Sequence, residues 1–275
     1  MTRTTTTTTT TTRFGDGSAG DIDYGSAGID YAVYRQPDPT IAARVREALG
    51  TSRHVLNVGA GAGSYEPTDR VVTAVEPSAT MRAQRPAHLT AAIDAVAEDL
   101  PFADGSFDAS MATYTVHQWS DLERGLAEMR RVTRAGGAIV ILAADPARLH
   151  DFWVAEYMTE ALDIEMTRFP AIDRLATLLG PTAEIQHVPI PLDCRDGFTE
   201  AYYGRPERFL EPGVRGAMSS WTHVAPARMA RFEADLRHDL ESGAWDAKHG
   251  HLRTQPFYDG ALRLIVRPQE PSLRE

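Results

Sequence analysis

The chain has 275 residues and a mass of 30.2 kDa, enough for one large domain or two small ones with a sizeable hydrophobic core. Charged residues make up 24% of it and the formal net charge is −10, so there is no basic excess for a phosphate backbone, and we expect no nucleic-acid partner. No apolar run approaches the roughly 20 residues that a membrane-spanning helix needs, so we also expect no membrane partner.

Cysteine usage and the N-terminal residues indicate the compartment. Cys194 is the single cysteine and cannot form an internal disulfide, and the first residues lack the apolar core of a secretory signal. These features predict a cytoplasmic protein. Residues 4–12 are an unbroken threonine tract without an apolar stripe, which is typical of disorder. We therefore expect a disordered tail over residues 1–20 and a single domain over residues 21–275.

The first predicted elements are a helix and a series of strands. Asp38 followed by Pro39 is a helix start, and Ile41, Val45 and Leu49 then fall on one apolar face. Because strands that are apolar throughout alternate with helical segments, we expect an α/β fold with a largely parallel sheet covered on both faces. Apolar runs predict strands over residues 54–58, 71–75, 93–97, 106–112, 138–143, 185–192 and 261–266.

Helical segments lie between and after these strands. One is predicted around residues 78–84, and a second begins at a capping box, Ser120 to Glu123, and ends at Gly136–Gly137. Beyond residue 145, aromatic-rich helical segments occupy about residues 147–180 and 197–247. We expect these two segments to be insertions that form a cap over a bound substrate.

The densest motif is a run of glycines directly after the first strand. Gly59, Gly61 and Gly63 stand where backbone can approach a ligand closely. A dinucleotide fingerprint needs a glycine or alanine where this chain has Ser64, and Pro67 interrupts the helix that would bind a pyrophosphate. The spacing therefore disfavours a nicotinamide-dependent oxidoreductase, although that class remains the first alternative.

Glu76 ends the second strand, where a carboxylate can accept hydrogen bonds from both ribose hydroxyls. With further blocks downstream, the chain resembles the class I S-adenosylmethionine-dependent methyltransferases, in particular their small-molecule, type 11-like branch, over about residues 30–145. The resemblance implies a Rossmann-like sheet of seven strands with the last strand antiparallel, and S-adenosylmethionine as cofactor with S-adenosylhomocysteine as product. The blocks that carry it are Val58–Gly63, Glu76–Met81, Ala97–Phe102, Asp104–Asp108 and the helix through Arg131-Val132 to Gly136-Gly137.

The resemblance also implies which residues hold the cofactor. The glycines would lie beneath its methionine part, Glu76 would hold the ribose, and Ser78 and Met81 would flank the adenine. Thr113 and Tyr114 would face the sulfonium and the acceptor. The full set is Tyr34, Arg35, Asn57, Gly59, Ala60, Gly61, Gly63, Glu76, Pro77, Ser78, Met81, Ala97, Glu98, Thr113 and Tyr114.

Two positions depart from the family pattern. The family usually has an acid where this chain has Asn57, and often an Asp where it has Val96. An amide oxygen accepts a hydrogen bond more weakly than a carboxylate does. These departures are the support for a second alternative, a non-catalytic module that binds S-adenosylmethionine without turnover.

Four side chains are candidates for catalysis. His117 follows the fourth predicted strand at the ligand edge of the sheet and is the first candidate for a general base, although it could only support the loop. Tyr202 and Tyr203 lie in the second insertion, where they could orient or deprotonate a phenol-like acceptor or simply fill the cap core. Tyr34 and Arg35 precede the first helix, in a segment that closes over the cofactor in related enzymes; a surface cluster is the alternative.

No metal site is expected. His249 and His251 have no third ligand at a recognisable spacing, and Lys248 stands alone, without the tyrosine partner of an oxidoreductase. The sequence thus predicts a methyltransferase that acts on a small aromatic or heteroaromatic molecule, indole- or phenol-like, by in-line displacement. Whether carbon, oxygen or nitrogen accepts the methyl group is left open, as is the oligomeric state.

Overall fold

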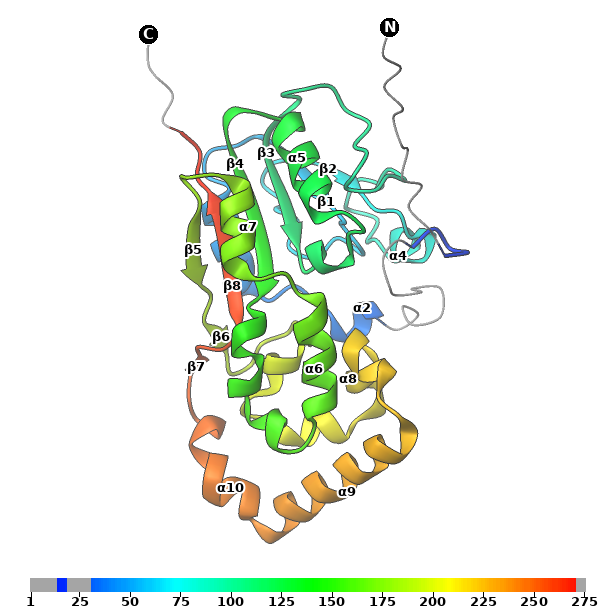
Figure 1. Ribbon diagram of the computed structural model, residues 1–275, viewed down its shortest axis with the longest axis vertical. Coiled ribbons are helices and arrows are strands. Elements are labelled where there is room, and N and C mark those ends of the chain that lie inside the picture. Colours follow the sequence, from blue (N-terminus) through cyan, green and yellow to red (C-terminus); the bar gives the residue numbers. More distant parts are fainter. Residues whose placement is uncertain (1–13, 19–30, 271–275) are drawn as a thin grey trace, which may run out of the picture.

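The computed structural model describes residues 14–18 and 31–270, and a six-stranded sheet organises them (Figure 1). The strand order is β2-β1-β3-β4-β8-β5, with a separate two-stranded sheet of β6 and β7. The threonine tract lies outside the described residues. The strands are β1 (His54–Val58), β2 (Val71–Val75), β3 (Phe107–Thr113), β4 (Thr133–Ala144), β5 (Glu184–His187), β6 (Ile190–Pro191), β7 (Phe257–Tyr258) and β8 (Leu262–Arg267).

The direction of the strands agrees with the prediction of a mixed α/β sheet. Strands β2, β1, β3 and β4 are parallel, and β8, the last strand of the chain, runs antiparallel to β4 and β5. The central strand β4 is buried from Gly137 to its end at Ala144 because both faces of the sheet are covered.

The sheet has six strands in the described residues rather than the seven expected. The segment predicted as a strand over residues 93–97 makes a single bridge, Ile93 beside Val75. Ile93 exchanges backbone hydrogen bonds with Ala74 and Glu76, and the chain then leaves the sheet edge. Asp94 is half exposed and pairs with Arg82, so the strand ends after one residue.

Helices cover both faces of the sheet. One face packs against α5 and α7 through side chains such as Leu126, Met129 and Leu175, and the other packs against α3 through Ile41 and Val45. The α-helices are α2 (Tyr31–Tyr34), α3 (Pro39–Ala48), α4 (Ala79–Ala83), α5 (Leu122–Val132), α6 (Thr159–Arg168), α7 (Ile172–Leu179), α8 (Pro212–Gly216), α9 (Pro226–Ser242) and α10 (Ala244–His249).

Helix boundaries follow local capping chemistry. Asp38 caps α3 as predicted, because its carboxylate accepts the backbone N–H groups of Thr40 and Ile41. The prediction for α5 was wrong by one residue: Asp121 is the N-cap, and the Ser120 hydroxyl donates to Glu98 instead.

The predicted end of α5 at Gly136–Gly137 was also wrong. The helix stops at Val132 and β4 begins at the next residue. Gly137 lies inside that strand. A Cβ at this position would stand 2.5 Å from the carbonyl oxygen of Asp108, so the strand needs a glycine here.

Beyond β4 the chain forms a cap below the carboxyl ends of β3 and β4 (Figure 1). Its core is aromatic, with Trp153 in edge contact with Phe209 and Trp245. Helix α7, within the segment expected to be the first insertion, packs on the sheet instead of in the cap. The 3₁₀ helices are η1 (Val116–Gln118), η2 (Pro146–Asp151), η3 (Trp153–Glu156), η4 (Thr199–Tyr202), η5 (Pro206–Leu210), η6 (Ser219–His223) and η7 (Gly250–Arg253).

The strand-like run over residues 185–192 divides into β5 and β6, which belong to different sheets. Over residues 14–18 and 31–270, no helix combines the length and the apolar character that a membrane crossing requires.

Candidate functional site

A pocket with about 760 Å³ of open space lies at the carboxyl ends of β1, β2 and β3. We call it the glycine-loop pocket. In a largely parallel sheet this edge is where ligands bind. The pocket is lined by Ser18, Gly59, Ala60, Gly61, Ala62, Ser64, Glu76, Pro77, Met81, Val96, Ala97, Glu98, Thr113, Tyr114, Thr115, Gln118 and Trp119.

The glycines of the loop are needed for close packing as well as for backbone shape. Gly59 and Gly63 have positive φ angles of 68° and 96°, which side chains disfavour. A Cβ on Gly59 would stand 2.1 Å from the Thr115 hydroxyl oxygen, and one on Gly63 would stand 2.3 Å from Leu89. Gly59 therefore brings the loop against the segment after β3, whereas Gly63 faces away from the pocket.

No helix follows the loop between β1 and β2: residues 59–70 form turns. The position lacks the helix N-terminus that binds a pyrophosphate in dinucleotide-binding folds. This geometry suits a nucleoside with a single sugar better than a dinucleotide.

Glu76 stands at the end of β2 with both carboxylate oxygens held by backbone. One oxygen accepts the N–H of Gly61 at 2.8 Å, and the other accepts the N–H of Ser78 at 2.9 Å. Burial raises the pKa of the carboxyl, although these two N–H groups oppose that shift. Each oxygen keeps a second lone pair, so the carboxylate can still accept hydrogen bonds from the two hydroxyls of a ribose.

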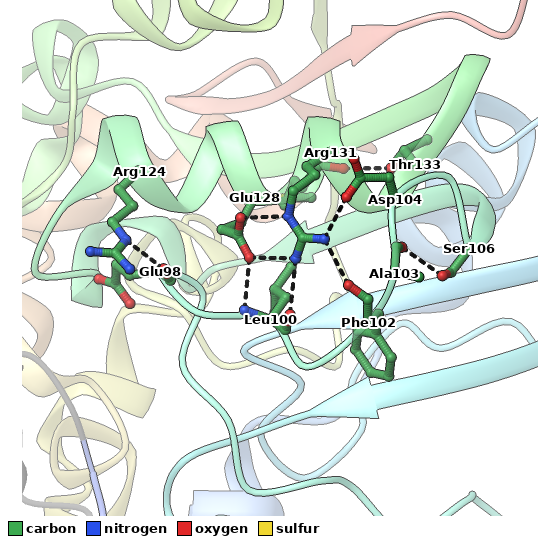
Figure 2. Close-up of polar contacts among 11 residues, drawn as sticks. Glu98, Leu100, Phe102, Ala103, Asp104, Ser106, Arg124, Glu128, Arg131 and Thr133 are labelled. Atoms are coloured by element: carbon green, nitrogen blue, oxygen red, sulfur yellow. Dashed lines mark hydrogen bonds and ion pairs between the residues drawn. The ribbon is translucent and has the colours of Figure 1, made fainter.

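The wall formed by Ala97 and Glu98 is fixed by a loop that is tied to α5 (Figure 2). The Arg131 guanidinium donates to the carbonyl oxygens of Leu100 and Phe102 and to the Asp104 carboxylate. The Leu100 N–H in turn donates to Glu128, the i−3 partner of Arg131. The block from Ala97 to Asp108 thus has a structural explanation, because its backbone carbonyls satisfy the partly exposed fork of donors on Arg131.

An N-terminal segment also reaches this pocket. Asp16 accepts a hydrogen bond from the Ser78 hydroxyl at 2.6 Å, and its carbonyl oxygen accepts the N–H of Ala79 at 2.7 Å. Ser18 is buried and lines the pocket. The sequence alone did not indicate this contact, because Asp16 and Ser18 lie in a glycine- and serine-rich stretch.

Ten of the fifteen residues expected at the cofactor line the glycine-loop pocket; Tyr34, Arg35, Asn57, Gly63 and Ser78 do not. Ser78 instead caps α4, accepting the N–H of Met81. Asn57 lies fully buried on β1 and donates through Nδ2 to Glu66, which also binds Arg85. Asn57 is thus tied to the ion pair of Glu66 and Arg85, and neither Asn57 nor Glu66 lines the glycine-loop pocket.

A second cavity of about 470 Å³, the cap pocket, adjoins the first through the side chain of Tyr114, which lines both. Tyr114 adopts a positive φ of 53°. Its ring stacks on that of Phe198, with the two ring centroids 5.4 Å apart. The cap pocket is lined by Arg35, Tyr114, His117, Ala144, Leu149, Glu165, Phe169, Phe198, Thr199, Glu200, Met218 and Ser219.

His117 is the one expected catalytic residue that lines the cap pocket. Its ring stacks on Phe169 with centroids 4.3 Å apart. Burial lowers its pKa to about 3, and the charges of Arg168 and Arg35 act in the same direction. The imidazole is therefore uncharged at neutral pH.

The three tyrosines have other surroundings. Tyr203 is fully buried, stacks on Tyr258 and donates its hydroxyl to the carbonyl oxygen of Gln255. Tyr202 packs edge-on against Phe209 in the cap core. Tyr34 packs against the same core outside both pockets.

Arg35 faces the cap pocket, with its guanidinium carbon 5.2 Å from the centre of the Tyr114 ring. Its Nε donates to Asp196 at 2.5 Å, and the other Asp196 oxygen accepts the Tyr65 hydroxyl at 2.8 Å. This network joins the segment before α3, the glycine loop and the cap.

Sequence reasoning missed Glu165 and Glu200, two carboxyls that line the cap pocket. A signal existed for Glu165, which continues the buried stripe of Ala161 and Leu162 along α6, where a charged residue is out of place. The cap folds these residues together from separate segments, so spacing could not have paired them.

No metal centre is found: within residues 14–18 and 31–270, no three histidine, cysteine or acidic side chains are grouped to hold an ion. His249 and Lys248 both contact Glu156.

Comparison with known proteins supplies the family. The profile of the family described as a methyltransferase domain matches residues 56–141. A crystal structure described as a methyltransferase from an antibiotic biosynthesis pathway of Anabaena variabilis is 28% identical and superposes with a TM-score of 0.78, over 85% of this chain and 98% of that one. Residues 56–141 therefore form a methyltransferase domain of the class I S-adenosylmethionine-dependent kind.

Curated relatives match the chain over shorter stretches. A malonyl-[acyl-carrier protein] O-methyltransferase of Erwinia billingiae is 33% identical over 144 residues, 50% of this chain and 55% of the relative. A demethylmenaquinone methyltransferase of Renibacterium salmoninarum is 36% identical over 107 residues, 35% of this chain and 44% of the relative. The chain spans about half or less of the length of these curated relatives.

The cofactor of such domains is S-adenosylmethionine, and the glycine-loop pocket of this chain fits it. The glycine loop packs close to Met81 in the pocket wall, since a Cβ on Gly61 would stand 3.3 Å from the Met81 side chain. Glu76 presents a carboxylate at the end of β2, the position where a ribose binds in such folds.

Proposed function

We propose that this protein transfers the methyl group of S-adenosylmethionine to a small molecule with an aromatic body held in the cap pocket. The observation that carries the proposal is Tyr114, whose side chain lines the glycine-loop pocket on one side and the cap pocket on the other. Two ligands in these pockets would meet at the carboxyl end of β3.

Residues of the glycine-loop pocket would bind and orient the cofactor. Glu76 would accept the ribose hydroxyls, and Gly59 and Gly61 would bring backbone against the methionine part. Met81 and Ala97, both buried at the pocket wall, would pack on the adenine. When bound, S-adenosylmethionine supplies a methyl group on a positively charged sulfur.

The cap pocket would align the acceptor and exclude water. Alignment of two reactants lowers the barrier by several kcal/mol without any covalent intermediate, which suits a displacement at carbon. Phe169 and Phe198 offer ring faces for an aromatic body, and Met218 gives an adaptable apolar wall.

His117 would contact the acceptor as a neutral hydrogen-bonding group. Because its pKa is lowered to about 3, its imidazole is uncharged at neutral pH and holds a proton poorly. Replacement of His117 with alanine should slow turnover more than it weakens binding of S-adenosylhomocysteine. Equal turnover in the variant would remove His117 from the reaction.

The names of the relatives suggest two different acceptors, a malonyl group on a carrier protein and demethylmenaquinone. The ring-lined cap pocket favours an acceptor with a ring over a malonyl chain.

Calorimetry with S-adenosylhomocysteine tests the cofactor site. Replacing Glu76 with glutamine should weaken binding about tenfold, ~1.4 kcal/mol, because the ribose loses a charged acceptor. The exposed Glu47, replaced in the same way, is the control and should leave affinity unchanged. Thermal unfolding of both variants checks the loop, since Glu76 also accepts the N–H groups of Gly61 and Ser78.

Three outcomes separate the alternatives. Tight binding of NAD(P) without binding of S-adenosylhomocysteine would support an oxidoreductase and overturn the proposal. Binding of S-adenosylhomocysteine without transfer of a labelled methyl group to any member of a broad metabolite panel would indicate a non-catalytic module. A mass increase of one methyl group on a ring-containing metabolite is the expected result.

A further inference from the structure

Two carboxyl groups face the cap pocket from different parts of the cap. Glu165 lies on α6, and Glu200 lies on η4, next to Thr199 and directly after the Phe198 ring. Glu165 is close enough to Glu200 for its charge to raise the pKa of that carboxyl. The cavity therefore presents a pair of acids beside its aromatic walls.

Both carboxyls are held in place by neutral donors. Glu165 accepts the hydroxyls of Ser220 at 2.9 Å and Thr199 at 3.2 Å. The two oxygens of Glu200 accept the backbone N–H of Ala261 at 2.9 and 2.8 Å. Among the residues that the structure describes, no lysine, arginine or histidine forms an ion pair with either carboxyl.

The charges around the pair do not replace such a partner. Arg35 is the cation among the lining residues, and its charge is offset by Asp196, which accepts its Nε at 2.5 Å. His117 is neutral at ordinary pH. Arg168, Arg148 and Arg263 act on the pair only through longer-range attraction, which opposes the effect of burial.

Glu200 is buried and Glu165 is half-buried. Acids in such positions without a paired cation are costly to ionise, because a charge taken out of water is stabilised only by a paired charge and good hydrogen bonds. Burial accordingly raises the pKa of both carboxyls, that of Glu200 to about 8. A ligand that brings a positive charge to this position would relieve that cost.

The rest of the cavity suits the body of such a ligand. Tyr114 stacks on Phe198 and His117 stacks on Phe169, so ring faces surround the space beside the carboxyls. Aromatic faces attract cations as well as other rings.

We propose that the cap pocket binds an aromatic molecule that carries a protonated amine, with the ammonium group held by Glu165 and Glu200. The assignment rests on the proposed function, in which the cap pocket holds the acceptor, and it names the chemical class of that acceptor: an arylalkylamine rather than a neutral phenol or an aryl acid.

Three indole compounds that share a ring and differ in the charge of the side chain test this proposal. Tryptamine, tryptophol and indole-3-propionate are titrated at pH 7 into the full chain saturated with S-adenosylhomocysteine. Tryptamine should bind about tenfold or more tightly than tryptophol, because charge-assisted hydrogen bonds are the stronger ones, and indole-3-propionate should bind most weakly. Equal affinity for tryptamine and tryptophol, or a preference for indole-3-propionate, would overturn the proposal.

Variants then locate the charge. Replacing Glu165 or Glu200 with glutamine should lower tryptamine affinity about tenfold and change tryptophol affinity by less than about threefold. Glu160→Gln is the matched control on the same helix, since Glu160 pairs with Arg228 away from the pocket, and it should leave both affinities unchanged. A parallel loss for tryptamine and tryptophol in the folded variants would contradict a role in charge recognition.

The two proposals fail in different ways. If S-adenosylhomocysteine does not bind, the methyltransferase proposal is wrong. If it binds and the three indole compounds show no preference for the amine, the assignment of the acceptor class alone is wrong. If a glutamine variant fails to fold, the unmodified chain with the three compounds still decides the question.

Discussion

At the scale of single residues, buried acids set the chemistry of both pockets. Glu76 keeps its carboxylate under the glycine loop because two backbone N–H groups hold it there. Both oxygens of Glu200 share a single backbone N–H, that of Ala261. A second acid, Glu165, lies close enough to act on the pKa of Glu200. Burial raises the pKa of both Glu76 and Glu200, and the charge of Glu165 adds to this effect at Glu200, whose pKa is about 8.

The raised pKa of Glu200, about 8 against an ordinary 4.5, predicts how stability depends on pH. The folded protein holds this proton more tightly than the unfolded chain does between these values. The contribution of Glu200 to stability is therefore present below about pH 4.5 and is lost as the pH rises towards 8.

Glu200→Gln should isolate this contribution, because the amide is neutral at every pH and its oxygen can still accept the Ala261 N–H. The melting temperature of the variant, relative to the unmodified chain, should rise between pH 5 and pH 8 in ligand-free protein. Glu47→Gln, an exposed change, should give a constant difference. A Glu200→Gln difference that stays constant, or falls with pH, would show that this carboxyl is already ionised.

At the scale of elements, α5 shapes the glycine-loop pocket through a glycine. Trp119 lines the pocket and packs over Gly125 of the helix. A Cβ on Gly125 would stand 2.5 Å from the Trp119 ring and 3.3 Å from Ala97. Both neighbours are pocket walls, so the helix has given up a better helix former to let them approach.

Gly125→Ala should therefore destabilise the protein by about 1–2 kcal/mol, since overpacking outweighs the gain of ~1 kcal/mol in helix propensity. Displacement of Trp119 should also weaken S-adenosylhomocysteine binding about threefold or more. Gly216→Ala, at the end of α8 with open space around it, should be neutral or slightly stabilising. Chemical denaturation and calorimetry measure both effects, and a stabilised Gly125→Ala would refute the packing argument.

The loop between Ala97 and β3 depends on a different feature of α5, the fork of Arg131 (Figure 2). Arg131→Lys keeps the charge but cannot reach Leu100, Phe102, Asp104 and Glu128 at once, so we expect a loss of about 1–3 kcal/mol.

The neighbouring Arg130→Lys is the control, because Arg130 makes one hydrogen bond, to the carbonyl oxygen of Leu178. It should cost less than about 0.5 kcal/mol. Equal denaturation midpoints for the two variants would mean that the fork does not hold the loop.

At the scale of the whole molecule, local chemistry explains what could be predicted. The parallel strands, the Asp38 cap and the position of Glu76 at the end of β2 follow from runs of adjacent residues, and the structure has them where the sequence placed them. The expected strand at residues 93–97 makes a single bridge, at Ile93, and the next residue, the exposed Asp94, pairs with Arg82, a contact with no local signature.

The cap pocket could not be predicted for the same reason. Its walls come from α6, η4 and η6, and from Arg35 before α3, which meet only when the cap folds over the sheet. Tyr202 and Tyr203 look like site residues in a list of aromatics, yet packing against Phe209 and Tyr258 places them in the cap core.

The N-terminal segment links distant parts of the chain in a way that can be tested by truncation. Residues 14–18 contact the start of α4 through Asp16, and Ser18 forms part of the glycine-loop pocket. A chain that begins at residue 14 keeps these contacts and should bind S-adenosylhomocysteine within about twofold of the unmodified chain. A chain that begins at residue 19 loses them and should bind about tenfold more weakly.

Asp16→Ala distinguishes this contact from a general effect of shortening. The variant keeps the full length but leaves the Ser78 hydroxyl without its acceptor at 2.6 Å, so the corner between β2 and α4 should loosen beside Glu76. We expect it to lower affinity in the same direction as the truncation at residue 19, by about threefold or more, measured by calorimetry. If Asp16→Ala binds normally while the shorter chain does not, the pocket depends on the segment's presence and not on this hydrogen bond.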